Sequence, residues 1–142
     1  MSIGYVLDTF ALLVYLRGEP GDEQVRELLS QAEGGERCLH LCLINYGEVI
    51  YISERQGGRL AAEEAVRIVD NLPVEVVPAD RRLTFAAAHV KANYPLSYAD
   101  AFVVALAQRL GATVVTGDPE FKSVASLVDI EWLPQPEAKH TS

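Results

Sequence analysis

Residues 4–18 read Gly-Tyr-Val-Leu-Asp-Thr-Phe-Ala-Leu-Leu-Val-Tyr-Leu-Arg-Gly and indicate the fold class. The stretch begins as an apolar run that ends abruptly at Asp8, which is typical of a buried strand. From Phe10 the residues have helix-forming character up to Gly18, where a helix is expected to end. A strand that runs directly into a helix, with an acid at the junction, is typical of the start of an α/β fold.

The same alternation continues along the rest of the chain. Further strands are predicted at 37–43, 74–77, 112–116 and 130–133, and further helices at 20–34, 44–56, 59–72, 80–94, 97–111 and 119–127. The strands contain continuous, β-branched apolar runs, which are typical of parallel strands buried on both faces. The sequence therefore predicts a three-layer α/β/α fold in which helices cover a central, mostly parallel sheet.

The length and composition are those of one globular domain. The chain has 142 residues, of which 49% are apolar and 23% charged, and a chain of this size buries roughly two-thirds of its unfolded surface. We expect a single domain over residues 1–133. Residues 134–142, Pro-Gln-Pro-Glu-Ala-Lys-His-Thr-Ser, are expected to form a loose C-terminal tail.

Three features bear on where the protein acts and what it binds. The apolar segment 5–16 fits neither a signal peptide nor a membrane span, because Asp8 interrupts it and no Lys or Arg precedes it. Cys38 and Cys42 lie too far apart along one predicted strand for a disulfide, so two buried free thiols are expected. These features favour a cytoplasmic protein. The net charge of −8 argues against nucleic-acid binding through a broad basic face.

Two acidic residues follow predicted strands. Asp8 closes the first strand, and Asp118 follows Val-Val-Thr-Gly at 114–117. Both stand at the carboxyl end of a strand, which is where ligands bind in a parallel α/β sheet. Aspartate is also a favoured helix N-cap, and Pro119 suits the first position of a helix. Capping therefore explains either acid alone equally well.

Two further acids lie on predicted helices. Residues 97–100, Ser-Tyr-Ala-Asp, have the form of a capping box, yet Asp100 also lies on the apolar side of its helix. Glu48 is in the middle of the apolar helix 44–56, where burying an unpaired carboxylate would be costly. The nearest basic residue on that helix, Arg55, is about two turns away. A metal ion or a shared proton explains Glu48 better than capping does.

Taken together, these acids are arranged as a metal site requires. They come from two strand ends and two helices that are far apart in sequence and able to converge. Oxygen ligands select Mg²⁺ or Mn²⁺, and Mg²⁺ keeps several waters that a substrate phosphate and a nucleophile can use. The sequence therefore predicts a Mg²⁺ or Mn²⁺ site.

Four segments of the chain resemble the successive motifs of PIN domains. The resemblance extends over about residues 3–133 and is strongest to the VapC-like toxin ribonucleases of bacterial and archaeal type II toxin–antitoxin pairs. The last two motifs are the more specific. The segments are Val6-Leu-Asp-Thr-Phe-Ala-Leu-Leu13, Asn45-Tyr-Gly-Glu48, Leu96-Ser-Tyr-Ala-Asp-Ala-Phe-Val-Val-Ala-Leu-Ala107 and Val114-Val-Thr-Gly-Asp-Pro-Glu-Phe121.

The resemblance implies a metal-dependent endoribonuclease that hydrolyses RNA phosphodiester bonds with Mg²⁺ or Mn²⁺. It implies that the catalytic, metal-binding cluster consists of Asp8, Glu48, Asp100 and Asp118. Small polar residues beside these acids are candidates for supporting the site, although ordinary helix or strand-end hydrogen bonding explains them equally well. These supporting candidates are Thr9, Asn45 and Thr116.

The resemblance also implies binding partners: an RNA substrate, a cognate antitoxin protein and a second copy of the chain in a homodimer. The basic residues that we expect to contact RNA are Lys122, Arg81 and Arg82, with Lys122 the closest in sequence to the last acidic motif. A solvated lysine that contacts nothing is the alternative for Lys122.

Two other functions remain open at this point. The chain would be a catalytically silent binding module if its acids only cap helices. It would be a phosphate-handling enzyme if Asp8 served as a nucleophile that forms an aspartyl phosphate. Against the second function, Thr-Phe rather than another acid follows Asp8, and no lysine stands at an obvious partner position.

Overall fold

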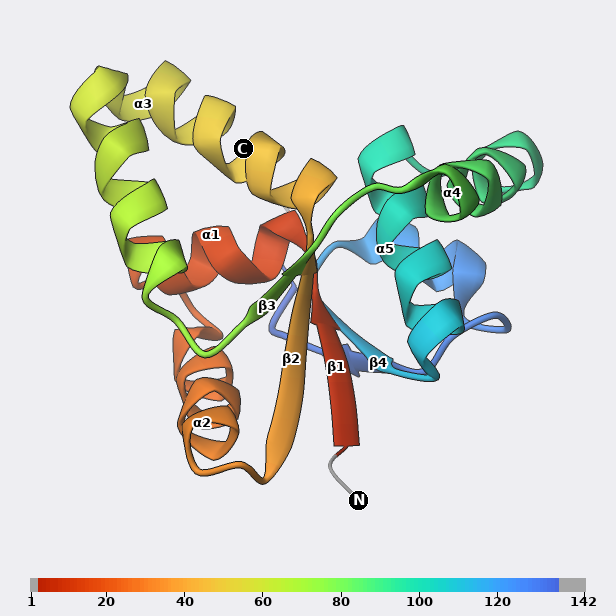
Figure 1. The fold of residues 1–142 in the computed structure, drawn as a ribbon, viewed down its shortest axis with the longest axis horizontal. Helices are drawn as coiled ribbons and strands as arrows, with labels where there is room; N and C mark the ends of the chain where they lie inside the picture. Colours follow the sequence, from red (N-terminus) through yellow and green to blue (C-terminus); the bar gives the residue numbers. More distant parts are fainter. Residues whose placement is uncertain (1–2, 136–142) are drawn as a thin grey trace, which may run out of the picture.

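A five-stranded sheet forms the centre of the protein in the computed structural model, which describes residues 3–135 (Figure 1). Its strands are β1 (Ile3–Leu7), β2 (Arg37–Cys42), β3 (Glu75–Val77), β4 (Thr113–Thr116) and β5 (Ile130–Trp132). They lie in the order β3-β2-β1-β4-β5, and each neighbouring pair is parallel. The prediction of a mostly parallel sheet is confirmed, and the described sheet is parallel throughout. From residue 136 onward, the expected C-terminal tail lies outside the described residues.

Helices occupy the positions that the apolar spacing predicted. They are α1 (Thr9–Arg17), α2 (Asp22–Glu33), α3 (Leu43–Asp70), α4 (Arg81–Asn93), α5 (Tyr98–Leu110) and the 3₁₀ helix η1 (Pro119–Val124). The helix expected over 119–127 is thus shorter and more tightly wound than predicted. Within residues 3–135, no helix is long and apolar enough to cross a membrane.

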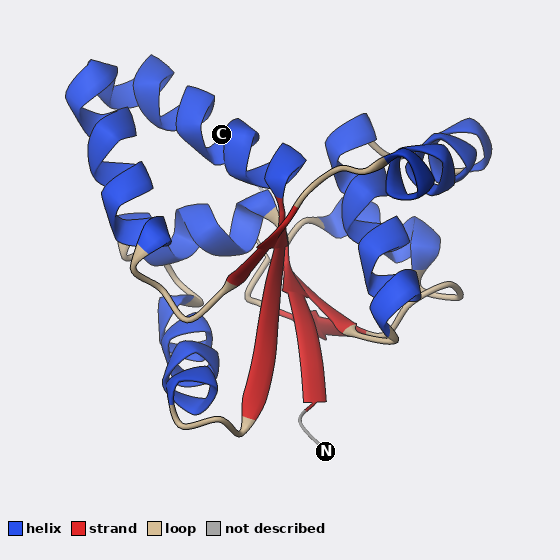
Figure 2. Ribbon diagram, viewed as in Figure 1, coloured by secondary structure: helices blue, strands red, loops and turns tan. Residues whose placement is uncertain are grey.

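The strands bury side chains on both faces of the sheet. Val6 and its register partner Val114 pack with α4 and α5 on one face. The next pair, Leu7 and Val115, packs with α1, α2 and α3 on the other face. A strand buried on both sides has no polar face, which is why these segments are continuously apolar in sequence. The predicted three-layer α/β/α architecture is confirmed (Figure 2).

One expectation for the core is wrong. Cys42 is buried, but Cys38 is exposed. Full burial along β2 begins only at Leu39, so the amino end of this strand is less well covered than its centre. Both cysteines are free thiols, as predicted.

The long helix α3 bends at Gly58. The backbone there has φ 82° and ψ −178°, a combination that glycine adopts readily and other residues rarely do. The bend divides α3 into the two helices that the sequence predicted on either side of Gly57-Gly58 (Figure 1). The Tyr46 hydroxyl in the first arm donates a hydrogen bond to Asp70 Oδ1 in the second arm at 2.7 Å. This bond ties the two arms together.

Parallel strands bring their carboxyl ends to the same edge of the sheet. The first turns of α1 and α3 follow directly after β1 and β2. The first turn of α5 lies at this edge too, because Asn45 Nδ2 in α3 donates to the Ala99 carbonyl at 3.2 Å. Segments that are far apart in sequence therefore meet here.

Replacement of Gly117 by alanine is expected to destabilise the protein. A Cβ at this position would overlap the Phe10 ring and lie 3.0 Å from the Pro134 carbonyl oxygen, and such overpacking costs about 1–3 kcal/mol. Gly47→Ala is the matched control, because Gly47 is helical and a Cβ there would meet nothing within 4 Å. We expect it to add about 0.5–1 kcal/mol of stability. Denaturant unfolding compares the two variants, and equal stabilities would contradict this packing.

Candidate metal centre

Asp8 is held rigidly at the end of β1. It is 1% exposed, and its Oδ1 accepts a hydrogen bond from the Ala11 amide at 2.7 Å, which caps α1. This oxygen therefore acts as a helix N-cap, which was one of the two explanations for Asp8. The other oxygen, Oδ2, accepts a hydrogen bond from the Thr116 hydroxyl at the end of β4. Asp8 thus does more than begin a helix.

Thr116 links Asp8 to the loop that follows β4. This threonine is fully buried, and its Oγ1 also accepts a hydrogen bond from the Asp118 amide at 3.0 Å. Asp118 in turn caps η1, because its Oδ1 accepts from the Glu120 amide at 2.9 Å. A single hydroxyl therefore fixes the positions of two acids that are 110 residues apart.

Asp100 lies in the first turn of α5 and is 8% exposed. Ser97 caps this helix, with its Oγ accepting from the Asp100 amide at 3.1 Å. Asp100 lies on the buried side of its helix, as expected. A carboxylate in this position is costly to bury unless something compensates its charge.

Glu48 belongs to a second hydrogen-bonded group at the same edge. The Thr9 hydroxyl donates to Glu48 Oε1 at 2.5 Å, and Asn45 Nδ2 donates to Thr9 Oγ1 at 3.3 Å. Asn45 is fully buried and also binds the first turn of α5. These contacts join α1, α3 and α5 beside the acids, so all three predicted supporting residues lie where the acids converge.

Glu48 is less buried than its place in an apolar helix indicated. Its side chain is only half-buried, because the outer side of the first arm of α3 stays exposed, with Ile44 38% and Tyr51 46% accessible. The apolar character of this helix had suggested a fully buried element. Glu48 therefore lies at the rim of the cluster rather than beneath it.

Sequence reasoning missed one acid, Glu120. In the described part of the chain, carboxylate oxygens of Asp100, Asp118 and Glu120 lie within 4.8 Å of one another. The signal was an acid two residues after Asp118, which the turn into η1 brings back to the same side. Asp8 and Glu48 lie outside this tight trio but close enough to interact with it.

Burial and mutual repulsion raise the pKa values of two of these acids. Burial is the main cause that raises the pKa of Asp8 from 3.8 to about 8; the charges of Asp100 and Asp118 raise it further, and hydrogen bonds from Thr116 and Ala11 oppose the shift. Burial likewise raises the pKa of Asp100 to about 7, followed by the Asp118 charge and smaller effects of other acids. The neighbouring carboxylates therefore add to the burial that disfavours ionisation of Asp8 and Asp100.

The donor set fits a hard divalent cation. The trio offers several carboxylate oxygens at distances that a single ion can bridge. A divalent cation would offset both the burial and the repulsion that raise these pKa values. At the same edge, Asn45 Oδ1 is buried without a hydrogen-bond partner among the described residues, so the site retains unused acceptor capacity. The residues present therefore suit Mg²⁺ or Mn²⁺.

The basic residues predicted to contact RNA lie in two different places. Lys122 is exposed in η1, two residues after Glu120 and close to the cluster in sequence. Arg81 and Arg82 begin α4, whose N-cap residue Asp80 pairs with Arg109 near the end of α5. Since Asp100 lies at the start of α5, the two arginines are at the opposite end of this helix pair from the cluster.

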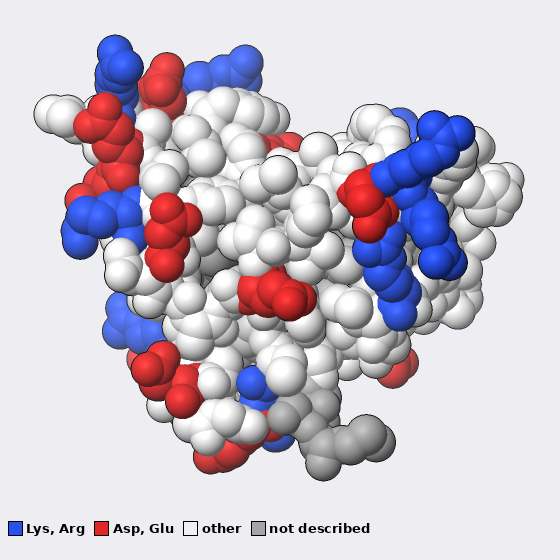
Figure 3. Space-filling view, in the orientation of Figure 1, with Lys and Arg blue, Asp and Glu red and all other residues white. Residues whose placement is uncertain are grey.

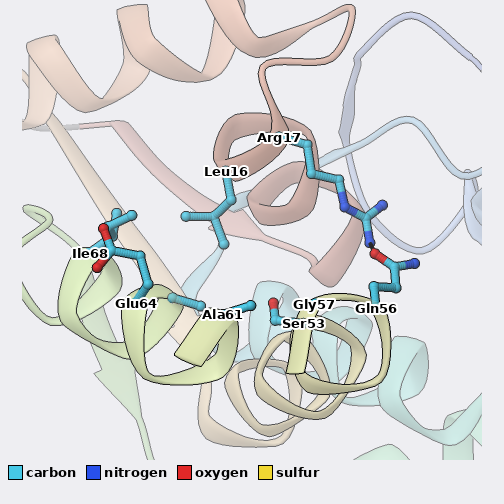
Figure 4. A pocket seen from close by; sticks show the side chains of 9 residues that line it. Leu16, Arg17, Ser53, Gln56, Gly57, Ala61, Glu64 and Ile68 are labelled. Atoms are coloured by element: carbon cyan, nitrogen blue, oxygen red, sulfur yellow. Dashed lines mark hydrogen bonds between the residues drawn. The ribbon is translucent and has the colours of Figure 1, made fainter. Parts of the chain in front are cut away.

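The pocket in Figure 4 is separate from these acids. It has a volume of about 310 Å³ and lies between the end of α1 and the two arms of α3. Leu16 and Ile68 line its apolar side, and Arg17 hydrogen-bonds to Gln56 at its rim. None of the five acids of the cluster lines this pocket.

Comparison with known families places the chain. A model of the PIN domain matches residues 5–127. This match covers most of the chain, which therefore belongs to the PIN-domain family, whose members are typically metal-dependent nucleases. A search of curated proteins found no match.

Solved structures with the same fold include toxins and toxin–antitoxin complexes. One is VapBC2 from Rickettsia felis bound to a promoter DNA fragment, with TM-score 0.74 and 18% identity over 92% of this chain and 99% of that chain. DNA-bound VapBC from Salmonella typhimurium has a TM-score of 0.70 and 23% identity over 91% of this chain and 97% of that chain. VapC20 from Mycobacterium tuberculosis, a Sarcin-Ricin loop cleaving toxin, has a TM-score of 0.69 and 19% identity over 89% of this chain and 98% of that chain. At these identities, the similarity shows the fold.

The metal-free protein is expected to lose stability as pH rises from about 4 to about 8. In this range the folded protein retains protons on Asp8 and Asp100 that the unfolded chain releases, so stability falls by up to about 1.4 kcal/mol per pH unit for each retained proton. Asp8→Asn should flatten the slope and be more stable than wild type at pH 8, since asparagine caps as well as aspartate.

Thermal melts in EDTA at pH 5, 6.5 and 8 measure this slope. The control is Asp129→Asn, an exposed acid before β5, which should retain the wild-type profile. Millimolar Mg²⁺ should raise the wild-type melting temperature at pH 8, because it binds the folded state. A flat profile in EDTA would show that the acids do not share a site.

Proposed function

We propose that this protein is a Mg²⁺- or Mn²⁺-dependent endoribonuclease that hydrolyses RNA phosphodiester bonds. The observation that carries the proposal is the convergence of acids from β1, α3, α5 and the loop after β4 at one edge of the sheet. The tightest part of this cluster is the trio whose oxygens lie within 4.8 Å of one another. Membership of the PIN-domain family supports the same chemistry.

We assign distinct roles to the acids. Asp100, Asp118 and Glu120 would hold the metal directly, and Asp8, which interacts with Asp100 and Asp118, would add its charge once a bound ion favours its ionised form. When bound, the ion supplies water activation and charge neutralisation at the phosphate. We assign to Glu48, which is half-exposed at the rim, the role of accepting the proton of the attacking water.

The polar neighbours would act by positioning these acids. Thr116 orients Asp8 and Asp118 together, and Thr9 orients Glu48. Asn45 holds Thr9 and the first turn of α5 in place. Supporting hydrogen bonds of this kind typically change metal affinity or activity by about 10- to 100-fold when removed. Lys122, exposed beyond the trio, is the first candidate for contact with the RNA backbone.

The cellular role that we propose is that of the toxin in a cytoplasmic toxin–antitoxin pair. Structures with this fold were solved as VapBC complexes and as a toxin–antitoxin complex from Klebsiella pneumoniae. Exposed apolar side chains near the cluster, Leu43, Ile44, Tyr51 and Tyr98, offer a surface for an antitoxin or for a second copy of the chain. A short gene for a DNA-binding antitoxin beside this gene would support the role.

The geometry disfavours an aspartyl-phosphate enzyme. Asp8 is 1% exposed, and each of its oxygens already accepts a hydrogen bond. A nucleophilic carboxylate must reach the substrate phosphate with a free oxygen. The catalytically silent alternative makes a different prediction, which an activity measurement tests.

Purified protein is expected to cut single-stranded RNA with Mg²⁺ or Mn²⁺ and to lose this activity in EDTA. Asp8→Asn and Asp100→Asn should each lower the rate more than about 100-fold without unfolding the protein, because each removes charge from the metal-binding cluster. The charge-matched control, Asp129→Asn, should retain wild-type activity. Full activity in EDTA, or in both cluster variants, would refute the metal-nuclease proposal.

A further inference from the structure

The start of α4 has a basic and aromatic surface that the candidate metal centre does not use. It consists of Arg81, Arg82, Phe85 and His89, which we call the α4 patch, and all four residues are exposed. The Arg81 guanidinium lies over the Phe85 ring, 4.6 Å from its centroid. Figure 3 shows basic side chains gathered over α4, whereas basic and acidic side chains alternate on the side of α2 and α3. This local positive charge contrasts with the net charge of −8.

Helix stability does not explain the two arginines. They occupy the first turn of α4, where the helix dipole disfavours positive charge. The first turn of α2 instead contains Asp22 and Glu23, and that of α5 contains Asp100. The charge at the start of α4 is therefore opposite in sign to what stabilises a helix.

The arginines also have no ion pair among the described residues. The acid beside them is Asp80, whose two oxygens are taken by a two-bond pair with Arg109 at 2.7 and 3.1 Å. Arg82 contributes only a weaker charge attraction to Asp80, the last of the causes that lower the pKa of this acid. Asp80 Oδ1 also accepts from the Leu83 amide at 2.8 Å, so it caps the helix. Arg81 and Arg82 therefore remain available to an external anion.

Phe85 adds a feature that phosphate binding alone does not need. It is 60% exposed, and the Arg81 guanidinium lies over its ring. Surfaces that bind single-stranded nucleic acid combine cations along the backbone with an aromatic ring on which a base stacks. A guanidinium over the ring strengthens such a platform by cation–π attraction.

We propose that the α4 patch is a second RNA-binding surface, at which Arg81 and Arg82 contact phosphates and a base stacks on Phe85. This inference rests on the proposed ribonuclease function and extends it to substrate recognition outside the cleavage site. The patch would select RNA by the length of its single-stranded segment rather than by base identity, because stacking tolerates any base.

The helix geometry sets the length of RNA that reaches both places. Arg109 follows Asp100 by nine residues on α5, a rise of about 14 Å along the helix axis. Since Arg109 pairs with Asp80, the N-cap of α4, the patch lies near the carboxyl end of α5. A stacked strand rises about 3.4 Å per nucleotide, so roughly four nucleotides are needed to span the gap. A dodecanucleotide is therefore long enough to occupy the metal centre and the patch together.

Fluorescence anisotropy in EDTA, where cleavage is blocked, measures binding of an unstructured RNA dodecamer. The R81A/R82A double variant should bind the dodecamer about 10-fold more weakly. The plot of log K against log salt concentration should also become less steep by about 1.4, because each of the two lost phosphate contacts contributes about 0.7 to the slope. Phe85→Ala should weaken binding about 5- to 10-fold with an unchanged slope.

The matched control is R59A/R67A, which removes the same charge from exposed positions on the second arm of α3. It should bind the dodecamer within about two-fold of wild type if charge loss alone does not weaken binding. Thermal melts should show the patch variants to be as stable as wild type, because their side chains are exposed and the dipole disfavours the arginines.

The outcomes separate this inference from the proposed function. The proposed RNA-binding surface would be refuted, even if the protein cuts RNA, if both patch variants bound the dodecamer as tightly as wild type does. It would also be refuted if R59A/R67A lost as much dodecamer affinity as the patch variants. If the patch variants lose binding to a polyglutamate peptide but not to RNA, the patch serves an acidic protein partner instead. If RNA binds through the patch but wild type with Mg²⁺ cuts no RNA, the proposed ribonuclease activity is refuted and the RNA-binding surface is still supported.

Discussion

Burial of carboxylates beside one another at one edge of the sheet is the constraint on which this structure depends. Acids on separate segments converge there, and burial together with mutual charge holds two of them partly protonated near neutral pH. Hydrogen bonds from Thr116 and from backbone amides offset part of this cost. A fold that keeps such a cluster retains an unfavourable arrangement that a divalent cation relieves, which is typical of functional sites.

The rest of the fold keeps the acids from moving apart. Cores on both faces of the sheet fix the strands, and the capped first turns of α1, α5 and η1 fix the backbone beside Asp8, Asp100 and Asp118. Capping and ligation are therefore not alternatives here. Asp118 caps η1 through one oxygen, which orients its carboxylate and leaves the other oxygen for an ion.

The α/β class and the three layers could be predicted from the sequence because strands buried on both faces are continuously apolar, and the breaks at Gly58 and Pro95 separate the helices. The convergence of acids could be anticipated because the carboxyl ends of parallel strands share one edge. Glu120 was missed because its placement depends on the tight turn into η1, which has no apolar periodicity. The exposure of Glu48 and the remote position of Arg81 depend on how helices pack, which local sequence does not specify.

A Mn²⁺-soaked crystal, examined by anomalous diffraction at pH 7.5, tests most directly whether these acids form one metal site. The account predicts an anomalous peak bonded to oxygens of Asp100, Asp118 and Glu120 at about 2.1 Å, with Asp8 beside it. A peak confined to acids elsewhere on the surface, or none at millimolar Mn²⁺, would contradict it.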